Sequence, residues 1–240
     1  MLSLPEAINY WFLNSLPTTL ILVAGGQGLR MGAAIPKQFL PLQGKPVLYY
    51  AARTFLDTFP DIKIILVLPF EHISYGNIFL QAFDQRIDLE IVAGGLTRFH
   101  SVQNGLRETD ENSIVFIHDG VRPFITSELI TSCYAQALEL GSAIPATVVT
   151  DSIRQWNGHR FTAIKREHLR SVQTPQTFRA SLIKQAFEQE YDEAFTDEAT
   201  VLERNGGEAH LIDGLKSNIK ITSPEDLVVA EAFLQQLNPE

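Results

Sequence analysis

The sequence predicts an α/β fold with a doubly wound, mostly parallel sheet and a protruding β-hairpin arm. Short apolar runs alternate with longer segments of helical apolar spacing, which is typical of consecutive βαβ units. This rhythm breaks over residues 147–170, where two short segments flank Asn157-Gly158, the dipeptide most typical of a tight hairpin. An isolated hairpin is only marginally stable, so we expect the arm to pack on something else.

Five apolar runs predict buried strands, and three segments between them predict helices. The predicted strands are residues 20–23, 62–68, 89–92, 114–117 and 143–149. The predicted helices are residues 46–59, 98–106 and 127–140. In such a sheet, ligands bind at the carboxyl ends of the strands, and the polar motifs of this sequence follow strand ends.

The C-terminal part returns to alternating elements. A helix is predicted over residues 199–205, and strands are predicted over 209–212 and 219–221. The last helix is predicted to begin at Ser223-Pro224-Glu225-Asp226, because serine caps helices, proline suits the first turn and acids favour the positive end of the dipole. Asn218 and Thr222 flank Lys220 with a period of two, so we expect all three side chains on one face of a strand.

Composition limits the class of protein. The 240 residues are 45% hydrophobic and no Pro/Gly/Ser-rich linker divides them, so a single domain over residues 1–240 is expected. Residues 1–18 are an N-terminal extension to which the sequence assigns no role. The net charge of −9 opposes nucleic-acid or membrane-surface partners, which favour a basic face.

Cysteine content and hydropathy point to a cytoplasmic protein. Cys133 is the only cysteine, so an internal disulfide is impossible, and we expect a small core residue in a reducing compartment. No apolar run reaches the length of a membrane span.

The residues after the first predicted strand carry the strongest functional signal. They read Ala24-Gly25-Gly26-Gln27-Gly28-Leu29-Arg30, and Pro36-Lys37 follows. Glycines let backbone N–H groups approach an anion closely, and two cations then flank the loop. This arrangement predicts a phosphate loop with catalytic cations, suited to a triphosphate whose charge rises during reaction.

Two common phosphate motifs do not fit. The dinucleotide fingerprint requires a third glycine, where this chain has Met31. The Walker pattern requires Ser or Thr after Gly-Lys, but Pro46 follows Gly44-Lys45.

Further motifs follow in order along the chain. The full set is Ala24-Gly25-Gly26-x-Gly28-x-Arg30-Met31-Gly32, Pro36-Lys37-Gln38-Phe39, Gly94-Gly95-x-x-Arg98-x-x-Ser101-Val102, His118-Asp119-x-x-Arg122-Pro123, Asp151-Ser152, Arg166, Thr174-Pro175-Gln176, Thr196-Asp197-Glu198-Ala199 and Asn218-Ile219-Lys220-Ile221-Thr222. Together they resemble the signature of the 2-C-methyl-D-erythritol 4-phosphate cytidylyltransferase family, in the wider nucleotidyltransferase superfamily. The resemblance covers residues 20–234 and implies a Rossmann-like fold.

The resemblance implies transfer of CMP from CTP to methylerythritol phosphate in the non-mevalonate isoprenoid pathway. Magnesium would accompany CTP, held mainly by phosphate oxygens, with its protein ligands left open. The arm, residues 147–170, would cross to a second subunit of a homodimer. The alternative is a hairpin folded back on its own domain.

The resemblance also implies the roles of individual residues. By this resemblance, Arg30 and Lys37 would be catalytic and would contact the CTP phosphates. The remaining CTP-binding residues would be Ala24, Gly25, Gly26, Gly28, Gly94, Gly95, Arg98 and Ser101. The residues implied for the second substrate are Arg166, Lys220, Asp119, Arg122, Ser152 and Thr196. His118 is expected to be structural, and Asp119 could instead form an ordering ion pair with Arg122.

Two other functions stay open at this point. The same reaction on ribitol 5-phosphate is possible, because the Ala-Gly-Gly start and the segment His118 to Phe124 also occur in that sister family; Thr196-Asp197-Glu198-Ala199 favours methylerythritol phosphate. A nucleotide-binding module without turnover is the third reading. The sequence shows no nucleophile–base pair for covalent catalysis, and a dianionic phosphate monoester needs no general base.

Overall fold

The computed structural model describes residues 16–25 and 35–237. The strands are β1 (Thr18–Val23), β2 (Pro41–Leu42), β3 (Lys45–Pro46), β4 (Lys63–Leu68), β5 (Leu89–Ala93), β6 (Ile114–Asp119), β7 (Ser142–Val148), β8 (Arg154–Trp156), β9 (Phe161–Ala163), β10 (Arg170–Val172), β11 (Gln176–Arg179) and β12 (Leu211–Asp213). The helices are α2 (Val47–Thr58), α3 (Gly76–Gln81), α4 (Arg98–Arg107), α5 (Ser127–Leu140), α6 (Ala180–Ala186), α7 (Glu198–Arg204) and α8 (Pro224–Leu237). Short 3-10 helices are η2 (Lys37–Phe39), η3 (Phe70–Tyr75) and η4 (Arg166–His168).

The main sheet is parallel at its centre and antiparallel at one side. β6, β1, β4 and β5 lie side by side in this order and run parallel, with Leu20 paired to both Phe116 and Ile64. β11 adds antiparallel to β6, and β7 pairs antiparallel with β11 and β10. β12 pairs parallel with β7. The predicted doubly wound, mostly parallel sheet is therefore confirmed, with an antiparallel side that the sequence pattern did not indicate.

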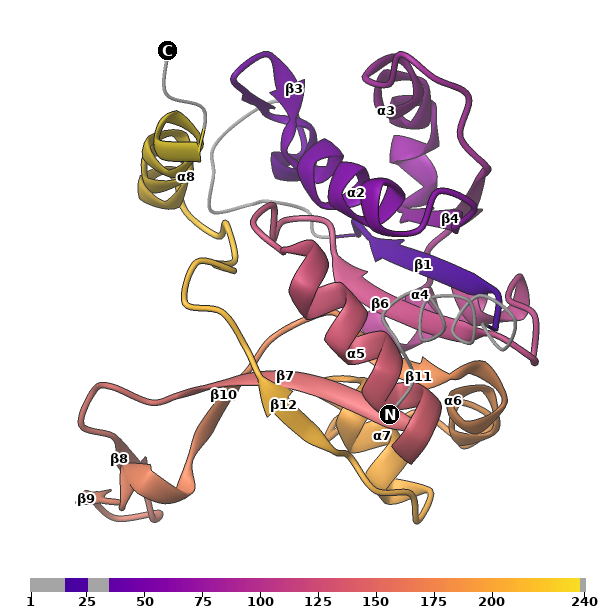
Figure 1. The fold of residues 1–240 in the computed structure, drawn as a ribbon. Helices are drawn as coiled ribbons and strands as arrows, with labels where there is room; N and C mark the ends of the chain where they lie inside the picture. Colours follow the sequence, from indigo (N-terminus) through magenta and orange to yellow (C-terminus); the bar gives the residue numbers. More distant parts are fainter. Residues whose placement is uncertain (1–15, 26–34, 238–240) are drawn as a thin grey trace, which may run out of the picture.

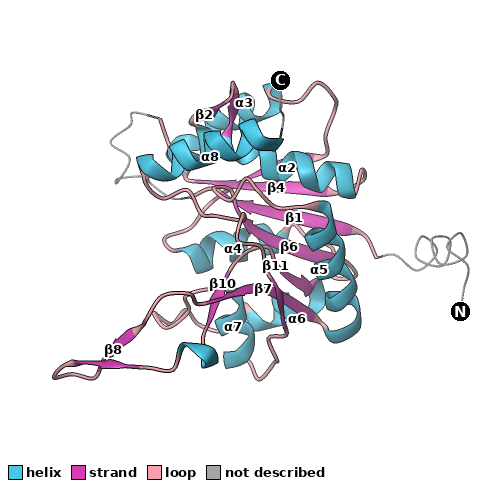
Figure 2. Ribbon diagram, turned by 60° about the vertical axis from the view of Figure 1, so that its left-hand side comes forward, coloured by secondary structure: helices cyan, strands magenta, loops and turns pink. Residues whose placement is uncertain are grey.

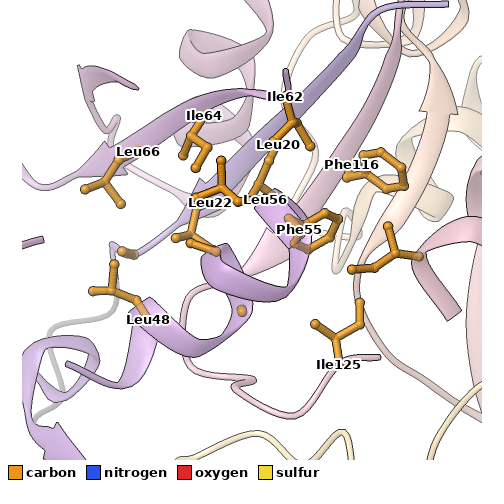
Figure 3. Close-up of a cluster of buried hydrophobic side chains, with 14 of the residues drawn as sticks. Leu20, Leu22, Leu48, Phe55, Leu56, Ile62, Ile64, Leu66, Phe116 and Ile125 are labelled. Carbon is orange, nitrogen blue, oxygen red and sulfur yellow. The ribbon is translucent and has the colours of Figure 1, made fainter. Parts of the chain in front are cut away.

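Helices cover both faces of this sheet, because alternate residues of each strand face opposite sides. On one face, β1, β4 and β6 pack against α2 and α5. Figure 3 shows this cluster, in which the labelled residues are Leu20, Leu22, Leu48, Phe55, Leu56, Ile62, Ile64, Leu66, Phe116 and Ile125. On the other face, Ile21, Ile65 and Ile117 pack against α4, α6 and α7. Each fully buried side chain of this size contributes about 1.5–3 kcal/mol.

A smaller cluster holds α8 against the first part of the chain. This cluster includes Leu42 of β2, Val47 of α2, and Ala230 and Leu234 of α8. Ile221 also belongs to it. Figure 1 shows α8 at the upper left, on the side of the molecule where the β2–β3 hairpin lies. This packing fixes the segment just before α8, which carries Lys220.

The predicted hairpin arm is confirmed. β8 and β9 pair antiparallel with each other, and the loop 157–160 closes with a hydrogen bond from the Asn157 N–H to the Arg160 carbonyl (3.2 Å). Gly158 has φ of +94°, a conformation that glycine adopts without steric cost. Figures 1 and 2 show the arm extending away from the sheet, beyond β7 and β10.

The other predicted elements are confirmed except one. The strand predicted over 219–221 is wrong, because the structure has an irregular segment there. Its alternation has another cause: Ile219 and Ile221 both face the α8 cluster, although only single backbone contacts, such as Ile221 N–H to the Val121 carbonyl (2.9 Å), hold the segment. Cys133 is buried as expected, and burial raises the pKa of its thiol to about 12.

Over residues 16–25 and 35–237, no helix is long and apolar enough to cross a membrane.

Candidate active site

A pocket of about 800 Å³ opens at the carboxyl ends of β6, β1, β4 and β5. This is the edge at which parallel α/β sheets bind ligands. The pocket brings together residues that are far apart in the sequence. Of the residues predicted for the site, it is lined by Ala24, Gly25, Lys37, Gly94, Gly95, Arg98, Ser101, Asp119 and Lys220. Arg30, Gly26 and Gly28 lie outside the described residues.

The start of the glycine loop is fixed by two hydrogen bonds. The Ala24 N–H donates to the Val67 carbonyl of β4 (3.0 Å), and the buried Gln38 side chain donates to the Ala24 carbonyl. Gln38 lies in η2, which begins directly after Pro36. The segment Pro36-Lys37-Gln38-Phe39 therefore fixes the start of the glycine loop through the Gln38 side chain. This role of Gln38 was not predicted from the sequence.

Lys37 extends from the same turn toward the C-terminal segment. Its Nζ donates to the Ile221 carbonyl at 3.1 Å. Thr222, the next residue, also lines the pocket, and its N–H and hydroxyl donate to the Asp226 carboxylate at 2.7 and 2.9 Å. Lys37 thus connects the loop after β1 with the segment before α8.

Asp119, the last residue of β6, is surrounded by three cations. Its Oδ2 lies 3.0 Å from Lys220 Nζ and 3.5 Å from Arg122 Nε, and its Oδ1 lies 3.3 Å from Arg98 Nη2. The predicted Asp119–Arg122 ion pair is present. It is one part of a larger network that also includes Lys220 and Arg98.

This network keeps Asp119 ionised. Burial alone would raise the pKa of the Asp119 carboxyl, but the three cations outweigh burial, Arg98 most strongly, and hold that pKa well below its ordinary range. For Arg122, burial is the largest effect and lowers the pKa of the guanidinium, while Asp119 opposes it. The carboxylate therefore acts as a permanent anion that orients cations at the edge of the pocket.

Arg98 also reaches a second carboxylate, Glu198 at the start of α7. Glu198 is almost fully buried and its Oε1 accepts a hydrogen bond from Arg98 Nη1. Burial raises the pKa of Glu198, and Arg98 opposes that shift. Glu198 was not among the residues predicted for the site; its place in the motif Thr196-Asp197-Glu198-Ala199 is the signal in the sequence that could have indicated it.

Hydrogen bonds join two of the sequence motifs, Thr174-Pro175-Gln176 and Thr196-Asp197-Glu198-Ala199. Asp197 caps α7 by accepting the Thr200 N–H (2.9 Å), which confirms the predicted cap pattern. Gln176 donates to Asp197 Oδ2 (3.0 Å) and accepts the Ala199 N–H (2.8 Å). Thr174-Pro175-Gln176 and the α7 motif are thus parts of one structural unit that positions Glu198. Thr196 itself is exposed and lies outside the pocket lining.

The pair Gly94-Gly95 has a packing role. A Cβ on Gly95 would lie 2.4 Å from His100 Cβ, and one on Gly94 would lie 3.0 Å from Ser101 Oγ. The Gly95 N–H donates to Ser101 Oγ (3.1 Å). These glycines therefore let the first turn of α4 sit directly on the end of β5, which brings Arg98 to the pocket.

The buried residues behind the pocket are structural. His118 is fully buried; burial lowers its pKa to about 4, so the ring is neutral. Its Nε2 is 3.0 Å from the Arg122 carbonyl and donates to it, which leaves Nδ1 to accept from the Thr174 hydroxyl (3.1 Å). Asn218 is also buried and donates to the Thr174 carbonyl (2.8 Å). The expected polar stripe is thus wrong for Asn218, which is buried, while Lys220 and Thr222 both line the pocket.

Arg166 and Ser152 lie on the arm, outside the pocket lining of their own chain. Both are exposed, and Arg166 donates to the Thr150 carbonyl. Arg122 is not among the lining residues either, although its guanidinium contacts the Asp119 carboxylate, which lines the pocket. The structure therefore gathers most of the predicted CTP residues and separates the arm residues from them.

Comparisons with known proteins show which family the chain belongs to. A model of the family 2-C-methyl-D-erythritol 4-phosphate cytidylyltransferase matches residues 18–236. A curated protein of that name from Bacteroides fragilis is 44% identical over 216 residues, covering 90% of this chain and 99% of that protein. One from Phocaeicola vulgatus is 43% identical over 214 residues, covering 89% and 98%.

Solved structures share the fold. A 4-diphosphocytidyl-2C-methyl-D-erythritol synthase from Anaerococcus prevotii superposes with a TM-score of 0.77 at 29% identity, covering 91% of this chain and 96% of the other. A 2-C-methyl-D-erythritol 4-phosphate cytidylyltransferase from Thermus thermophilus has a TM-score of 0.71 at 28% identity, covering 92% and 99%. The chain belongs to the 2-C-methyl-D-erythritol 4-phosphate cytidylyltransferase family.

Proposed function

We propose that this pocket binds CTP and transfers its cytidylyl group to 2-C-methyl-D-erythritol 4-phosphate, the reaction for which the family is named. One observation carries the proposal for the site. Lys37, Arg98 and Lys220 come from three distant parts of the chain and line one pocket at the carboxyl edge of the sheet. Two polyanions must meet in this reaction, and such a concentration of cations is what their approach requires.

The chemistry needs few protein groups. A phosphate oxygen of the acceptor forms a bond to the α-phosphorus of CTP, and the bond from that phosphorus to the bridging oxygen breaks. Pyrophosphate leaves with the electron pair. The second pKa of a phosphate monoester is about 6, so the nucleophile is already dianionic at pH 7 and no general base is needed. Catalysis consists of alignment and stabilisation of charge on the transferring phosphoryl group.

The proposed roles follow the geometry. Lys37 contacts the CTP phosphates beside the loop that begins at Ala24, and Arg30 of that loop joins it on sequence grounds. Lys220 holds the acceptor phosphate, with its ammonium group oriented by Asp119. Gly26 and Gly28 are proposed to bind the triphosphate through their backbone N–H groups.

Magnesium is proposed to enter with CTP. Among the described residues, no group of three or more His, Cys, Asp or Glu side chains could hold a metal ion. Asp119, a buried acidic residue of the pocket lining, is already surrounded by cations. These side chains do not fit a metal site of their own, and phosphate oxygens are the ligands that magnesium favours.

The arm is proposed to complete the site of a second copy of this chain. The arm, residues 147–170, carries five Lys or Arg residues and two acidic residues, in a chain of net charge −9. Its tip exposes Trp156 (55%) and Phe161 (62%), whose ring centroids are 5.0 Å apart. Apolar side chains of this size are normally buried, and β8 and β9 pair only with each other among the described strands. In the homodimer, Arg166 and Ser152 reach the partner's acceptor phosphate.

The function is tested by pyrophosphate release from CTP and magnesium, with methylerythritol 4-phosphate or ribitol 5-phosphate at equal concentration. Strong preference for the first acceptor is expected. Preference for ribitol phosphate would keep the CTP site and change the acceptor. Release with neither acceptor would contradict the proposal and favour a nucleotide-binding protein without turnover.

A further inference from the structure

Two large apolar side chains stand exposed at one end of the pocket. Phe70 is 80% exposed and Leu96 is 97% exposed, and both line the pocket. Phe70 begins η3 directly after Pro69 and β4, and Leu96 follows Gly94-Gly95 at the end of β5. A hydrogen bond from the Gly94 N–H to the Leu68 carbonyl (2.7 Å) holds these two strand ends together. Phe70 and Leu96 thus flank the same end of the pocket.

The cations among the described lining residues lie at its other end. Asp119 at the end of β6 gathers the charged groups of Arg98 and Lys220, and Lys37 reaches the neighbouring segment at Ile221. At the β4–β5 end, the charged lining residue within the described part of the chain is Glu71, which repels phosphate. This distribution of charge favours a nucleotide orientation with the phosphates toward β6 and the uncharged base toward β4 and β5.

The glycines at the β5 end line the pocket but have no side chain that could cover a base. Gly95 is close-packed against His100, and the Gly94 position is closed by Ser101. Both glycines are accounted for by the docking of α4. Among the described residues, the large apolar side chains that reach this end of the pocket are Phe70 and Leu96, and their apolar surface gains most from covering the flat face of a base.

We propose that Phe70 and Leu96 form an apolar clamp on the nucleobase of CTP. The inference rests on the proposed function and adds the residues that bind the base. Stacking of a base on an aromatic ring accepts any base, because every base has a π-face. The clamp therefore sets affinity for the nucleoside part and leaves the choice between bases to polar groups of the pocket.

The test separates base binding from phosphate binding. Calorimetry measures the Kd of CTP and of inorganic tripolyphosphate for the full-length protein and for Phe70→Ala, Leu96→Ala and Val228→Ala. Val228 is the matched control, because it is 67% exposed on α8 and does not line the pocket. Both test residues are exposed, so the variants are expected to fold, which circular dichroism checks.

The expected result is a rise on the order of tenfold in the Kd of CTP for each pocket variant. The Kd of tripolyphosphate and both constants of Val228→Ala stay unchanged. Wild-type CTP affinity in both pocket variants would overturn the clamp and leave the proposed function intact. An equal loss of affinity for tripolyphosphate would also overturn the clamp, because the two residues would then affect phosphate binding through the shape of the pocket and not through contact with the base. Failure of the wild-type protein to bind CTP would contradict the proposed function itself.

Discussion

The Nζ atom of Lys220 lies 3.0 Å from Oδ2 of Asp119, so a lysine from the C-terminal segment is fixed beside the end of β6. The same carboxylate contacts Arg98 and Arg122. A single buried anion thus sets the positions of three cations that come from separate parts of the chain. The proposed acceptor site depends on this anion even though a carboxylate would repel a phosphate.

The first prediction concerns this anion. Asp119→Asn removes the common partner of three cations, and loss of one partner of a buried ion pair costs about 3–5 kcal/mol. We expect a fall of about 3 kcal/mol in the free energy of unfolding, measured by urea denaturation at pH 7. Asp57→Asn is the control, because Asp57 pairs with Arg53 at the surface and such pairs contribute less than about 1 kcal/mol.

The difference in the free energy of unfolding between wild type and Asp119→Asn should depend on pH in a way that the pKa of Asp119 sets. Because the pKa of Asp119 is depressed in the folded protein, its stabilisation is complete above the unfolded pKa of about 4 and is lost as pH falls through the folded value. The gap between wild type and Asp119→Asn should therefore be constant from pH 8 to pH 5. A gap that shrinks already between pH 8 and pH 6 would contradict an ionised Asp119.

A second prediction concerns the buried pair Arg98–Glu198. Arg98→Met leaves the Glu198 carboxylate buried without its cation, at a cost of about 3 kcal/mol. In this variant the pKa of Glu198 lies further above its unfolded value, so the folded protein binds the extra proton. The loss in the free energy of unfolding is complete above the raised pKa of Glu198. It becomes smaller as pH falls toward the pKa that Glu198 has in the unfolded chain.

The double variant Arg98→Met/Glu198→Gln removes both charges. It should recover most of the stability lost in Arg98→Met at pH 7, as urea denaturation of the four proteins of the cycle would show. Additive losses in the double variant would mean that the two side chains do not interact in the way the structure indicates.

A third prediction concerns His118, whose pKa is lowered to about 4 by burial. A depressed histidine pKa means that the unfolded chain binds the proton first, so stability falls as pH drops below the unfolded value of about 6.5. Titration of His118 alone should lower the free energy of unfolding by about 2 kcal/mol between pH 7.5 and pH 5. His118→Asn should show a correspondingly flatter profile in urea denaturation. Parallel profiles for the two proteins would show that His118 titrates normally.

A fourth prediction concerns the arm. Trp156→Glu/Phe161→Glu places charges at the exposed apolar tip, and sedimentation should show a shift from dimer to monomer with the fold unchanged. Val228→Glu is the control, since it adds a charge to an exposed apolar position on α8. A wild-type protein that sediments as a monomer at micromolar concentration would overturn the dimer.

Subunit mixing tests whether the arm serves the partner's site. Lys37→Ala and Arg166→Ala should each be nearly inactive alone. After equimolar mixing and exchange, about a quarter of wild-type activity should return, because each heterodimer has one site with both residues intact. No recovery, with exchange verified independently, would place Arg166 in the site of its own chain.

Much of the fold could be predicted from the sequence because its signals are local. Buried parallel strands are short apolar runs, and Ser223-Pro224 marks the start of α8 through residues within one turn. The exception at 219–221 shows the limit: Ile219 and Ile221 alternate like a strand, yet they are buried by α8 without a partner strand. Periodicity reports which side chains are buried and does not report what the backbone pairs with.

The site was predictable as a set of residues and less so as a geometry. Lys37 and Asp119 were found through their motifs, but nothing local to the sequence joins Arg98 to Glu198, since their contact depends on how α4 and α7 pack. Gln38 was likewise missed as the support of Ala24. Phe70 gave no signal, because an aromatic residue after a strand is most often part of a core.

We propose above that cytidylyl transfer takes place in the pocket at the carboxyl ends of β6, β1, β4 and β5. The most direct test is the single-turnover rate of pyrophosphate release with saturating CTP and methylerythritol 4-phosphate in Lys37→Ala. The control is Lys216→Ala, an exposed lysine outside the pocket lining. We expect a rate about 100- to 1000-fold below wild type for Lys37→Ala, with the fold and the control unchanged. A near-wild-type rate in Lys37→Ala would show that this pocket is not the site of cytidylyl transfer.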